Sequence, residues 1–317
     1  MNHKTKHLSR LEKLLKQTVN PKLLKAFAKI FISALALYFV FTKIPFRDVW
    51  FQIKDANVFL MISALVLFVL SKILASFRLL LYFKAIGIKL DSITNLKLYL
   101  LGMFYNLFLP GGIGGDGYKI YLLKKQEYSN VRRLLGSVLV DRLSGLYALF
   151  CLLIITFVFC SFYIPCKQAL LILIPISYFA YQHFIKYIFP YLKTTTKACT
   201  LYSFIVQALQ MTMAFFLLLA LGQNANIPGY LFLFLVSSVV AALPLTIGGV
   251  GGREITALIG ADLLHLNIDI AIALSLCFYL ITALVSLSGI YYMIIPFETQ
   301  LYANKLSLNC TNSHESE

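Results

Sequence analysis

Charged residues are scarce in this chain. Only 13% of its 317 residues are Asp, Glu, Lys or Arg, while 60% are hydrophobic, and an average soluble domain carries about 25% charged residues. The longest polar stretches, 1–22 and 297–317, are too short to form a soluble domain of their own. This composition excludes an ordinary soluble enzyme. It predicts an all-α, polytopic membrane protein with about six spans of roughly 20 residues each.

The sequence also lacks the usual motifs of metal and cofactor chemistry. Its six cysteines include no C-x-x-C pair, and it shows no metal-ligand spacing, no phosphate-binding loop and no nucleophile elbow. We therefore expect neither a metal nor a cofactor. The net charge of +15 would suit nucleic acid, but the basic residues flank apolar segments, as they do in cytoplasmic loops of membrane proteins. We therefore expect no nucleic-acid partner.

Apolar runs define the expected spans. The first run, 23–44, has no small-residue cleavage pattern, which predicts an uncleaved span rather than a signal peptide. The crowding of lysines and arginines before it places the N-terminal tail, 1–22, in the cytoplasm, and the alternation of sides places the tail 297–317 there too. The six expected spans are 23–43, 58–83, 134–160, 168–189, 198–221 and 268–295.

Two further apolar segments, 95–110 and 229–247, each end in the same glycine-rich pattern. Residues 109–119 and 243–253 both fit L-P-x-x-I-G-G-x-G-x-[K/R]. A proline ends the incoming helix because it lacks an N–H and clashes with the preceding turn, and the glycines permit tight backbone turns. The expected breaks are Pro110, Gly114, Gly115, Pro244, Gly248 and Gly249, and short helices are expected to restart over about 117–126 and 252–260.

The distribution of basic residues indicates how these segments meet the membrane. The lysines and arginines of 84–97 and of 119–133 share one side only if the first apolar segment dips into the membrane and returns. The second segment follows an uncharged loop and precedes two aspartates, which favours a dip from the opposite side, although it is long enough to span. Two such re-entrant hairpins would relate the halves 58–160 and 198–295 as an inverted repeat, an arrangement typical of transporters.

Basic residues next to the two breaks predict an anion site. Lys119 and Arg253 occupy the same position in the two patterns. Each lies near the start of a restarting helix, and helix N-termini attract anions. Glu254 follows Arg253 and forms an adjacent charge pair after the second break. Two matched breaks, each with a basic residue at the same offset, favour a site for a phosphate or carboxylate over a hairpin without a ligand.

Charges inside the expected spans are costly in a bilayer and therefore usually face protein or a watery cavity. Arg78, Asp116, Asp141 and Arg142 are all expected near the cytoplasmic side, where they could form an ion-pair cluster. One interpretation is a structural lock, with Arg78 and Lys72 snorkelling towards the surface. The other is that Arg78 or Arg142 holds a lipid phosphate while a carboxylate fixes its orientation.

Polar and small residues form two stripes at helical spacing. Such stripes more often mark helix–helix packing than a substrate path, and packing is the favoured interpretation. The first comprises Thr200, Ser203, Gln207 and Gln210, and the second comprises Ser275, Tyr279, Thr282, Ser286 and Gly289.

These segments resemble the lysylphosphatidylglycerol synthase transmembrane family, also called the flippase-like domain family. The resemblance extends over about 60–300, with Leu79 where the family often has an aromatic residue, and its motif stretches are Ser76–Arg78, Tyr105–Asp116, Val140–Gly145 and Leu243–Glu254. It implies an integral inner-membrane protein that handles phospholipids or lipid-linked intermediates. By resemblance, the best site candidates are Asn106, Asp116, Asp141, Arg142 and Glu254.

The resemblance leaves three functions to weigh. The favoured one is a flippase that translocates an anionic phospholipid or a polyprenyl-linked lipid. The second is the membrane component of a lipid-modifying transferase, similar to a phosphatidylglycerol lysyltransferase, with Asp116, Asp141 or Glu254 as acid or base. We see no soluble aminoacyl-transferase domain and therefore expect no lysyl transfer by this chain alone. The third is an ion channel or exchanger. A homo-oligomer and a partner transferase both stay open.

Overall fold

A computed structural model describes residues 54, 56–108, 114–125, 130–160, 166–242 and 252–294. The described residues form helices and no strands. The elements are α4 (Val58–Ala85), α5 (Ser92–Phe108), α6 (Gly114–Lys125), α7 (Val131–Phe159), a 3-10 turn (Lys167–Ile172), α8 (Leu173–Ile188), a second 3-10 turn (Pro190–Leu192), α9 (Lys193–Ala220), α10 (Ile227–Ala242), α11 (Gly252–Leu263), α12 (Ile268–Leu287) and α13 (Gly289–Ile294).

The expected all-α, polytopic membrane architecture is confirmed. Five helical stretches are long and apolar enough to cross a membrane: Val58–Ala85, Val131–Phe159, Lys167–Ile188, Pro190–Ala220 and Ile268–Met293. They correspond to five of the six expected spans. The sixth, 23–43, lies outside the described residues, as do Pro110, Pro244, Gly248 and Gly249.

Asparagine side chains start three of the long helices. The Oδ1 atom of Asn57 accepts hydrogen bonds from the backbone N–H groups of Phe59 and Leu60, at 3.0 and 3.3 Å. Asn130 and Asn267 make the same kind of bond at the starts of α7 and α12. The first N–H groups of a helix have no partner within it, and asparagine is among the best residues at satisfying them. The sequence therefore sets these boundaries locally.

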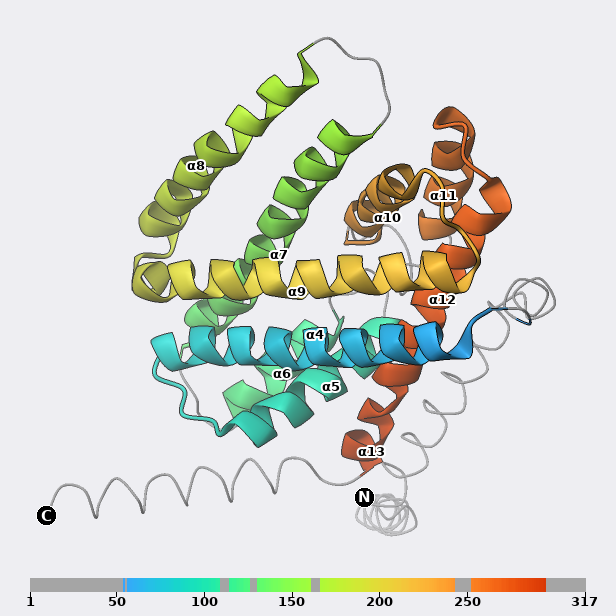
Figure 1. The fold of residues 1–317 in the computed structure, drawn as a ribbon. Helices are drawn as coiled ribbons and strands as arrows, with labels where there is room; N and C mark the ends of the chain where they lie inside the picture. Colours follow the sequence, from blue (N-terminus) through green and yellow to red (C-terminus); the bar gives the residue numbers. More distant parts are fainter. Residues whose placement is uncertain are drawn as a thin grey trace, which may run out of the picture.

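Helices α4 and α9 form the central pair of the bundle and run antiparallel (Figure 1). At one end, the backbone N–H of Asn57 donates to the carbonyl of Ala220 at 3.1 Å. Towards the other end, Arg78 donates from Nη1 to the hydroxyl of Ser203 at 2.9 Å. The start of α4 thus lies beside the end of α9. Helix α4 is the first helix of one half and α9 is the first helix of the other, and the sequence predicts these halves to be inverted relative to each other.

Each central helix is followed by a helical hairpin. In the first hairpin, the N–H of Gly115 at the start of α6 donates to Asn106 Oδ1 near the end of α5, at 2.8 Å. In the second, Arg253 at the start of α11 donates to the hydroxyl of Ser238 near the end of α10, at 3.2 Å. In both hairpins, the chain therefore doubles back on itself. The described part of α10, which extends to Ala242, has 16 residues.

The two hairpins organise separate hydrophobic cores. The α5–α6 hairpin packs with the C-terminal half of α4, and its core includes Tyr82, Phe104 and Leu123. The α10–α11 hairpin packs with the C-terminal half of α9, and its core includes Leu217 and Phe234. The hairpins lie on opposite sides of the α4–α9 pair (Figure 1).

The last helix of each half crosses over to the hairpin of the other half. Helix α7 packs against α10, where the rings of Phe157 and Phe232 lie 5.4 Å apart. Helix α12 packs against α5, where Leu107 contacts the group formed by Leu276, Tyr279 and Ala283. The set α4–α7 therefore makes the same pattern of contacts as the set α9–α12. Such a pattern is what an inverted repeat requires, whereas the depth of the hairpins in a membrane stays a prediction.

Helix α8 lies at the edge of the bundle and links the two halves. The ring of Tyr181 stacks on that of Tyr147 in α7 at 4.8 Å between centroids. Most of the remaining surface of α8 is exposed and apolar; Phe179, for example, is 73% exposed. Together with the preceding 3-10 turn, α8 makes up the 22-residue stretch Lys167–Ile188, and an exposed apolar face on a stretch of this length is typical of contact with lipid.

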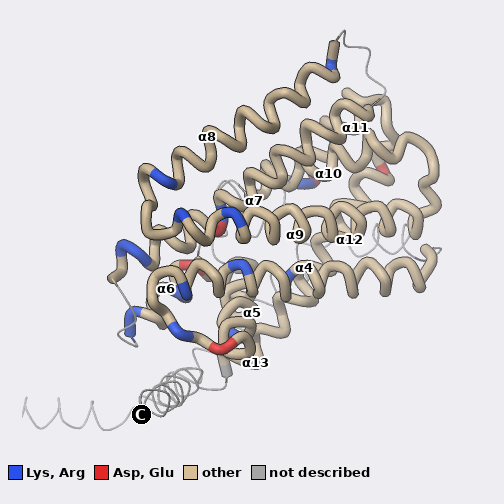
Figure 2. Tube along the Cα trace, turned by 60° about the vertical axis from the view of Figure 1, so that its left-hand side comes forward, with Lys and Arg blue, Asp and Glu red and all other residues tan. Residues whose placement is uncertain are grey.

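Charged side chains gather at one end of the bundle. Figure 2 shows most of the lysines and arginines at the end where α6 lies. The aspartates at 262 and 269 lie near the opposite end, at the turn between α11 and α12. By the positive-inside rule, the α6 end is predicted to be cytoplasmic.

Cysteine labelling tests this orientation. Lys124 and Asp262 are both exposed, and each can be replaced by cysteine in a background that carries Cys166→Ser and Cys310→Ser. In intact cells, a membrane-impermeant maleimide is expected to label Asp262→Cys but not Lys124→Cys, which should react only after permeabilisation. Labelling of both positions from the same side would contradict opposite entry of the two hairpins.

Candidate functional site

A buried ion pair joins α4 to α7. Arg78 donates from Nε and Nη2 to the two carboxylate oxygens of Asp141, at 2.7 and 3.1 Å, in a bidentate arrangement. Its remaining Nη1 bonds to Ser203 on α9. The two residues are 6% and 8% exposed. Arg78 therefore does not snorkel towards the surface, and its charge is matched within the protein.

A second group of ion pairs joins α6 to α7. One carboxylate oxygen of Asp116 accepts from Lys119 at 3.0 Å, and the other accepts from Nε of Arg142. Lys119 reaches this position across Gly102 of α5, where a Cβ would lie 2.2 Å from the lysine Cε. The structure thus brings together all four residues of the expected ion-pair cluster, with Lys119 added.

This cluster has the geometry of a structural lock. Both carboxylates are fully engaged, and the adjacent residues Asp141 and Arg142 tie α7 to α4 on one side and to α6 on the other. Only Arg142 keeps a substantial part of its side chain, 32%, open. No observation here assigns substrate binding to these residues, so their predicted role in holding a lipid stays a prediction.

A cavity of about 300 Å³ lies between the two halves. It is bounded by α4, by α5 of the first hairpin, by α10 and α11 of the second, and by α12. This volume could admit a polar headgroup. Its polar lining comprises Lys72, Tyr99, Asn106, Ser238, Arg253, Tyr279, Thr282 and Ser286. Of the residues predicted for the site, Asn106 and Arg253 therefore face the cavity.

Two cations from different halves line this cavity. The ammonium of Lys72 lies 4.5 Å from the ring centre of Phe68, and the guanidinium of Arg253 lies 4.5 Å from that of Phe278. These two rings touch each other edge to face, with centres 5.7 Å apart. Among the described residues, neither cation forms an ion pair with a carboxylate. Each cation thus lies against an aromatic ring, and Arg253 also donates a hydrogen bond to Ser238.

Hydroxyl groups without partners also line the cavity. Tyr279 is 4% exposed. Within the described part of the chain, neither its Oη atom nor Oγ1 of Thr282 has a hydrogen-bond partner. A buried hydroxyl normally has a hydrogen-bond partner, because a buried hydroxyl without one costs about 1–3 kcal/mol. Two such groups on the wall of one cavity therefore indicate a polar occupant.

Asn106 and Glu254 have local partners of their own. The side-chain oxygen of Asn106 caps the restarting helix α6 at Gly115, which leaves its amide N–H₂ group as a donor at the cavity. Glu254 accepts a hydrogen bond from Ser275 of α12, at 3.5 Å. Glu254 is not among the residues that line the large cavity.

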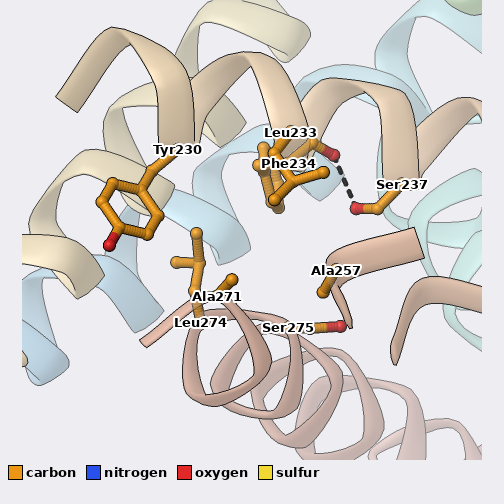
Figure 3. Close-up of a pocket in the computed structure, with 8 residues that line it drawn as sticks. All are labelled: Tyr230, Leu233, Phe234, Ser237, Ala257, Ala271, Leu274 and Ser275. Atoms are coloured by element: carbon orange, nitrogen blue, oxygen red, sulfur yellow. Dashed lines mark hydrogen bonds between the residues drawn. The ribbon is translucent and has the colours of Figure 1, made fainter. Parts of the chain in front are cut away.

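A second, smaller pocket lies between α10, α11 and α12 (Figure 3). Its lining is mainly apolar, and the hydroxyl of Ser237 already donates to the carbonyl of Phe234 at 2.8 Å. Its free volume of about 10 Å³ is at the lower limit for a single water molecule. This pocket is a packing gap and not a site for a headgroup.

Sequence reasoning missed several cavity residues. The sequence offers snorkelling as one interpretation of Lys72 and does not include it among the site candidates, although an ionisable residue within a span is by default a functional candidate. The stripe with Tyr279, Thr282 and Ser286 was assigned to packing, yet all three residues line the cavity. The other stripe does pack: Ser203 bonds to Arg78, and Gln207 donates to the carbonyl of Gly145. Spacing alone could not tell the two stripes apart.

The fold and the cavity define a polytopic helical membrane protein with a cationic pocket between two helical hairpins. Residues 26–199 match the family described as the lysylphosphatidylglycerol synthase TM region. The match covers more than half of the chain, and the protein therefore belongs to this family of membrane proteins related to lipid handling. It includes α4 to α8 and ends within α9, so Arg253, Tyr279 and Thr282 lie beyond it. No curated protein is significantly similar to the chain.

Proposed function

We propose that the protein is a flippase, which moves an anionic phospholipid or a polyprenyl-linked lipid between the leaflets of the cytoplasmic membrane. The observation that carries this proposal is the cavity in which Lys72 and Arg253, both without a carboxylate partner among the described residues, face the same space. A lipid phosphate supplies the negative charge that these cations lack, and its acyl or prenyl chains stay in the surrounding bilayer.

Electrostatics favours this assignment over a structural role for the two cations. A charge away from water is costly unless it is paired. The protein pairs Arg78 and Lys119 with carboxylates but leaves Lys72 and Arg253 to aromatic rings. A cation–π contact is worth about 0.5–2 kcal/mol, less than the solvation that these half-buried cations give up. The positive charge of Lys72 and Arg253 that no carboxylate balances would stabilise an incoming phosphate.

The position of the cations also suits alternating access. Lys72 belongs to α4 of the first half, and Arg253 belongs to α11 of the second. A small movement of one half against the other would open the shared cavity first towards one leaflet and then towards the other, as in transporters built from inverted repeats. The re-entrant depth of both hairpins is part of this proposal.

A vesicle assay tests the proposal. The purified protein is reconstituted in separate sets of liposomes that contain phosphatidylglycerol or phosphatidic acid with a fluorescent acyl chain, and dithionite then quenches the label in the outer leaflet. Protein-containing vesicles are expected to lose nearly all fluorescence, whereas empty vesicles lose half. Lys72→Met and Arg253→Gln are each expected to slow the second phase by about tenfold or more, because a charge-assisted hydrogen bond contributes about 1.5–3 kcal/mol.

Lys84→Gln is the matched control for these variants. Lys84 lies on the same helix as Lys72 but is exposed, so its loss should leave the rate unchanged. Fluorescence loss no faster than in empty vesicles would reject the flippase. Chloride flux through the same vesicles without lipid movement would instead favour a channel, since a small anion could also occupy a cationic cavity.

A further inference from the structure

The aromatic faces at the cavity are already occupied by the protein's own cations. Arg253 covers the ring of Phe278, and Lys72 covers that of Phe68. The ring of Tyr99, a third aromatic residue at this site, has the ammonium of Lys119 at 4.6 Å from its centre. Aromatic faces are one of the two common ways in which proteins bind an ammonium group, and three of those at or next to this cavity are taken.

The other common partner of an ammonium group is a carboxylate. None lines the cavity among the described residues. The nearest acidic residues of the first half, Asp116 and Asp141, are both engaged by protein cations. On the cavity wall, a headgroup that carries an ammonium would therefore meet two like charges and no carboxylate, since Glu254, the neighbour of Arg253 in α11, accepts from Ser275 and is not among the lining residues.

The cavity instead offers donors for oxygen atoms. Asn106 has its side-chain oxygen on Gly115 and so presents only N–H groups. The hydroxyls of Tyr279 and Thr282 have no partner within the described residues, and each can donate. Together with Lys72 and Arg253, they form a set suited to a group with several acceptor oxygens and no proton to give.

The charges of the cavity also fix the charge of its ligand. Lys72 and Arg253 form no ion pair within the described residues, so the cavity wall carries an excess of positive charge, which a ligand with two negative charges compensates more fully than a ligand with one. We propose that the cavity selects lipids whose headgroup ends in a phosphate monoester or a diphosphate, and that it rejects headgroups with an ammonium. This selectivity rests on the proposed function, because the same cavity serves both.

A competition experiment on the full chain in a neutral detergent tests this selectivity. The probe is phosphatidic acid with a fluorescent acyl chain, followed by fluorescence polarisation at pH 7, where a phosphate monoester, whose second pKa is about 6, carries close to two negative charges. Dioleoyl phosphatidic acid is expected to displace the probe at a concentration at least about tenfold lower than dioleoyl phosphatidylglycerol does. Phosphatidylethanolamine and lysyl-phosphatidylglycerol are expected to be still weaker competitors.

Three outcomes would overturn the proposal. Phosphatidylglycerol could compete as well as phosphatidic acid, which would remove the preference for two charges. A lipid with an ammonium could compete as well as phosphatidic acid, which would remove the discrimination against cations. Glycerol 3-phosphate could compete at the same concentration as phosphatidic acid, which would assign the site to a soluble phosphate ester and not to a lipid.

Variants test whether the preference for phosphatidic acid over phosphatidylglycerol depends on Lys72 and Arg253. Lys72→Met and Arg253→Gln each leave a single unpaired charge, so the preference for phosphatidic acid over phosphatidylglycerol is expected to fall to about twofold or less. Lys84→Gln should keep the full preference. An unchanged preference in both cavity variants would overturn the assignment of the site, and the wild-type competition decides the selectivity even if a variant fails to fold.

This experiment measures binding and not transport, so the two proposals can fail separately. Selective binding of phosphatidic acid without lipid movement in vesicles would reject the flippase and keep the selectivity. Equal movement of phosphatidic acid, phosphatidylglycerol and phosphatidylethanolamine, with equal binding, would keep the flippase and reject the selectivity.

Discussion

Asp141→Asn is expected to destabilise the protein by about 3–5 kcal/mol, because it leaves the buried charge of Arg78 without its partner. The carboxylate accepts hydrogen bonds from two nitrogen atoms of the guanidinium. An amide side chain has only one acceptor oxygen and no charge. A thiol-reactive dye can follow thermal unfolding in detergent, since Cys151, Cys199 and Cys277 are free and buried in the folded protein. A melting temperature lower by about 10 °C is expected.

A double variant separates lost charge from lost packing. Arg78→Met combined with Asp141→Leu removes both charges and keeps apolar volume, which often costs little in other proteins. Its melting temperature is expected to recover most of the loss seen in Asp141→Asn. If the single and the double variant melt at the same temperature, the ion pair is not what holds α4 and α7 together.

Gly115→Val is expected to have the second large effect, because it forces the first hairpin apart. A Cβ at this position would lie 1.8 Å from the carbonyl oxygen of Gly102 on α5 and 2.9 Å from Oδ1 of Asn106. The obstacle is backbone, which cannot rotate away as a side chain can. Overpacking typically costs about 1–3 kcal/mol and sometimes more, and this contact belongs at the upper end of that range.

Gly117→Ala is the control for this prediction. Gly117 lies on the same helix, is exposed and has no atom within 4 Å of the position of a Cβ. Alanine favours a helix over glycine by about 1 kcal/mol, so the melting temperature should stay level or rise. Lipid movement in vesicles should be lost in Gly115→Val and kept in Gly117→Ala. Equal behaviour of the two variants would show that the close approach of α5 and α6 is not required.

Hydropathy and helix breakers predicted most of the architecture. Four of the five described spans fall within a few residues of their expected positions, and the fifth, Pro190–Ala220, begins eight residues before the expected 198. A long apolar run is a local property of the sequence, and its length matches the thickness of the bilayer. The restart of a helix after each break also follows from local chemistry, because proline and glycine act on their own stretch of backbone. The second helix begins at Gly252 as expected, whereas α6 begins at Gly114, before the expected 117, so the expected breaks Gly114 and Gly115 lie in its first turn.

The partners of the charged residues depended on packing. The sequence grouped Arg78, Asp116, Asp141 and Arg142 by expected depth, and they do lie together, but nothing in their spacing paired Arg78 with Asp141 and left Asp116 to Arg142. Which side chains meet depends on how α4, α6 and α7 are rotated about their axes. The rotation of each helix depends on contacts between helices, such as the close approach of Lys119 in α6 to Gly102 in α5, which form only when the chain folds.

By itself, the sequence determined that this chain is an all-α membrane protein of the lysylphosphatidylglycerol synthase TM region family and that two glycine-rich breaks interrupt its helices. Only the tertiary structure decided that Lys72 and Arg253, 181 positions apart in the numbering, line one cavity while Lys119 is paired elsewhere. The reason is physical. Hydrophobicity and backbone restriction act within one helix, whereas a cavity exists only where several helices fail to fill the space between them.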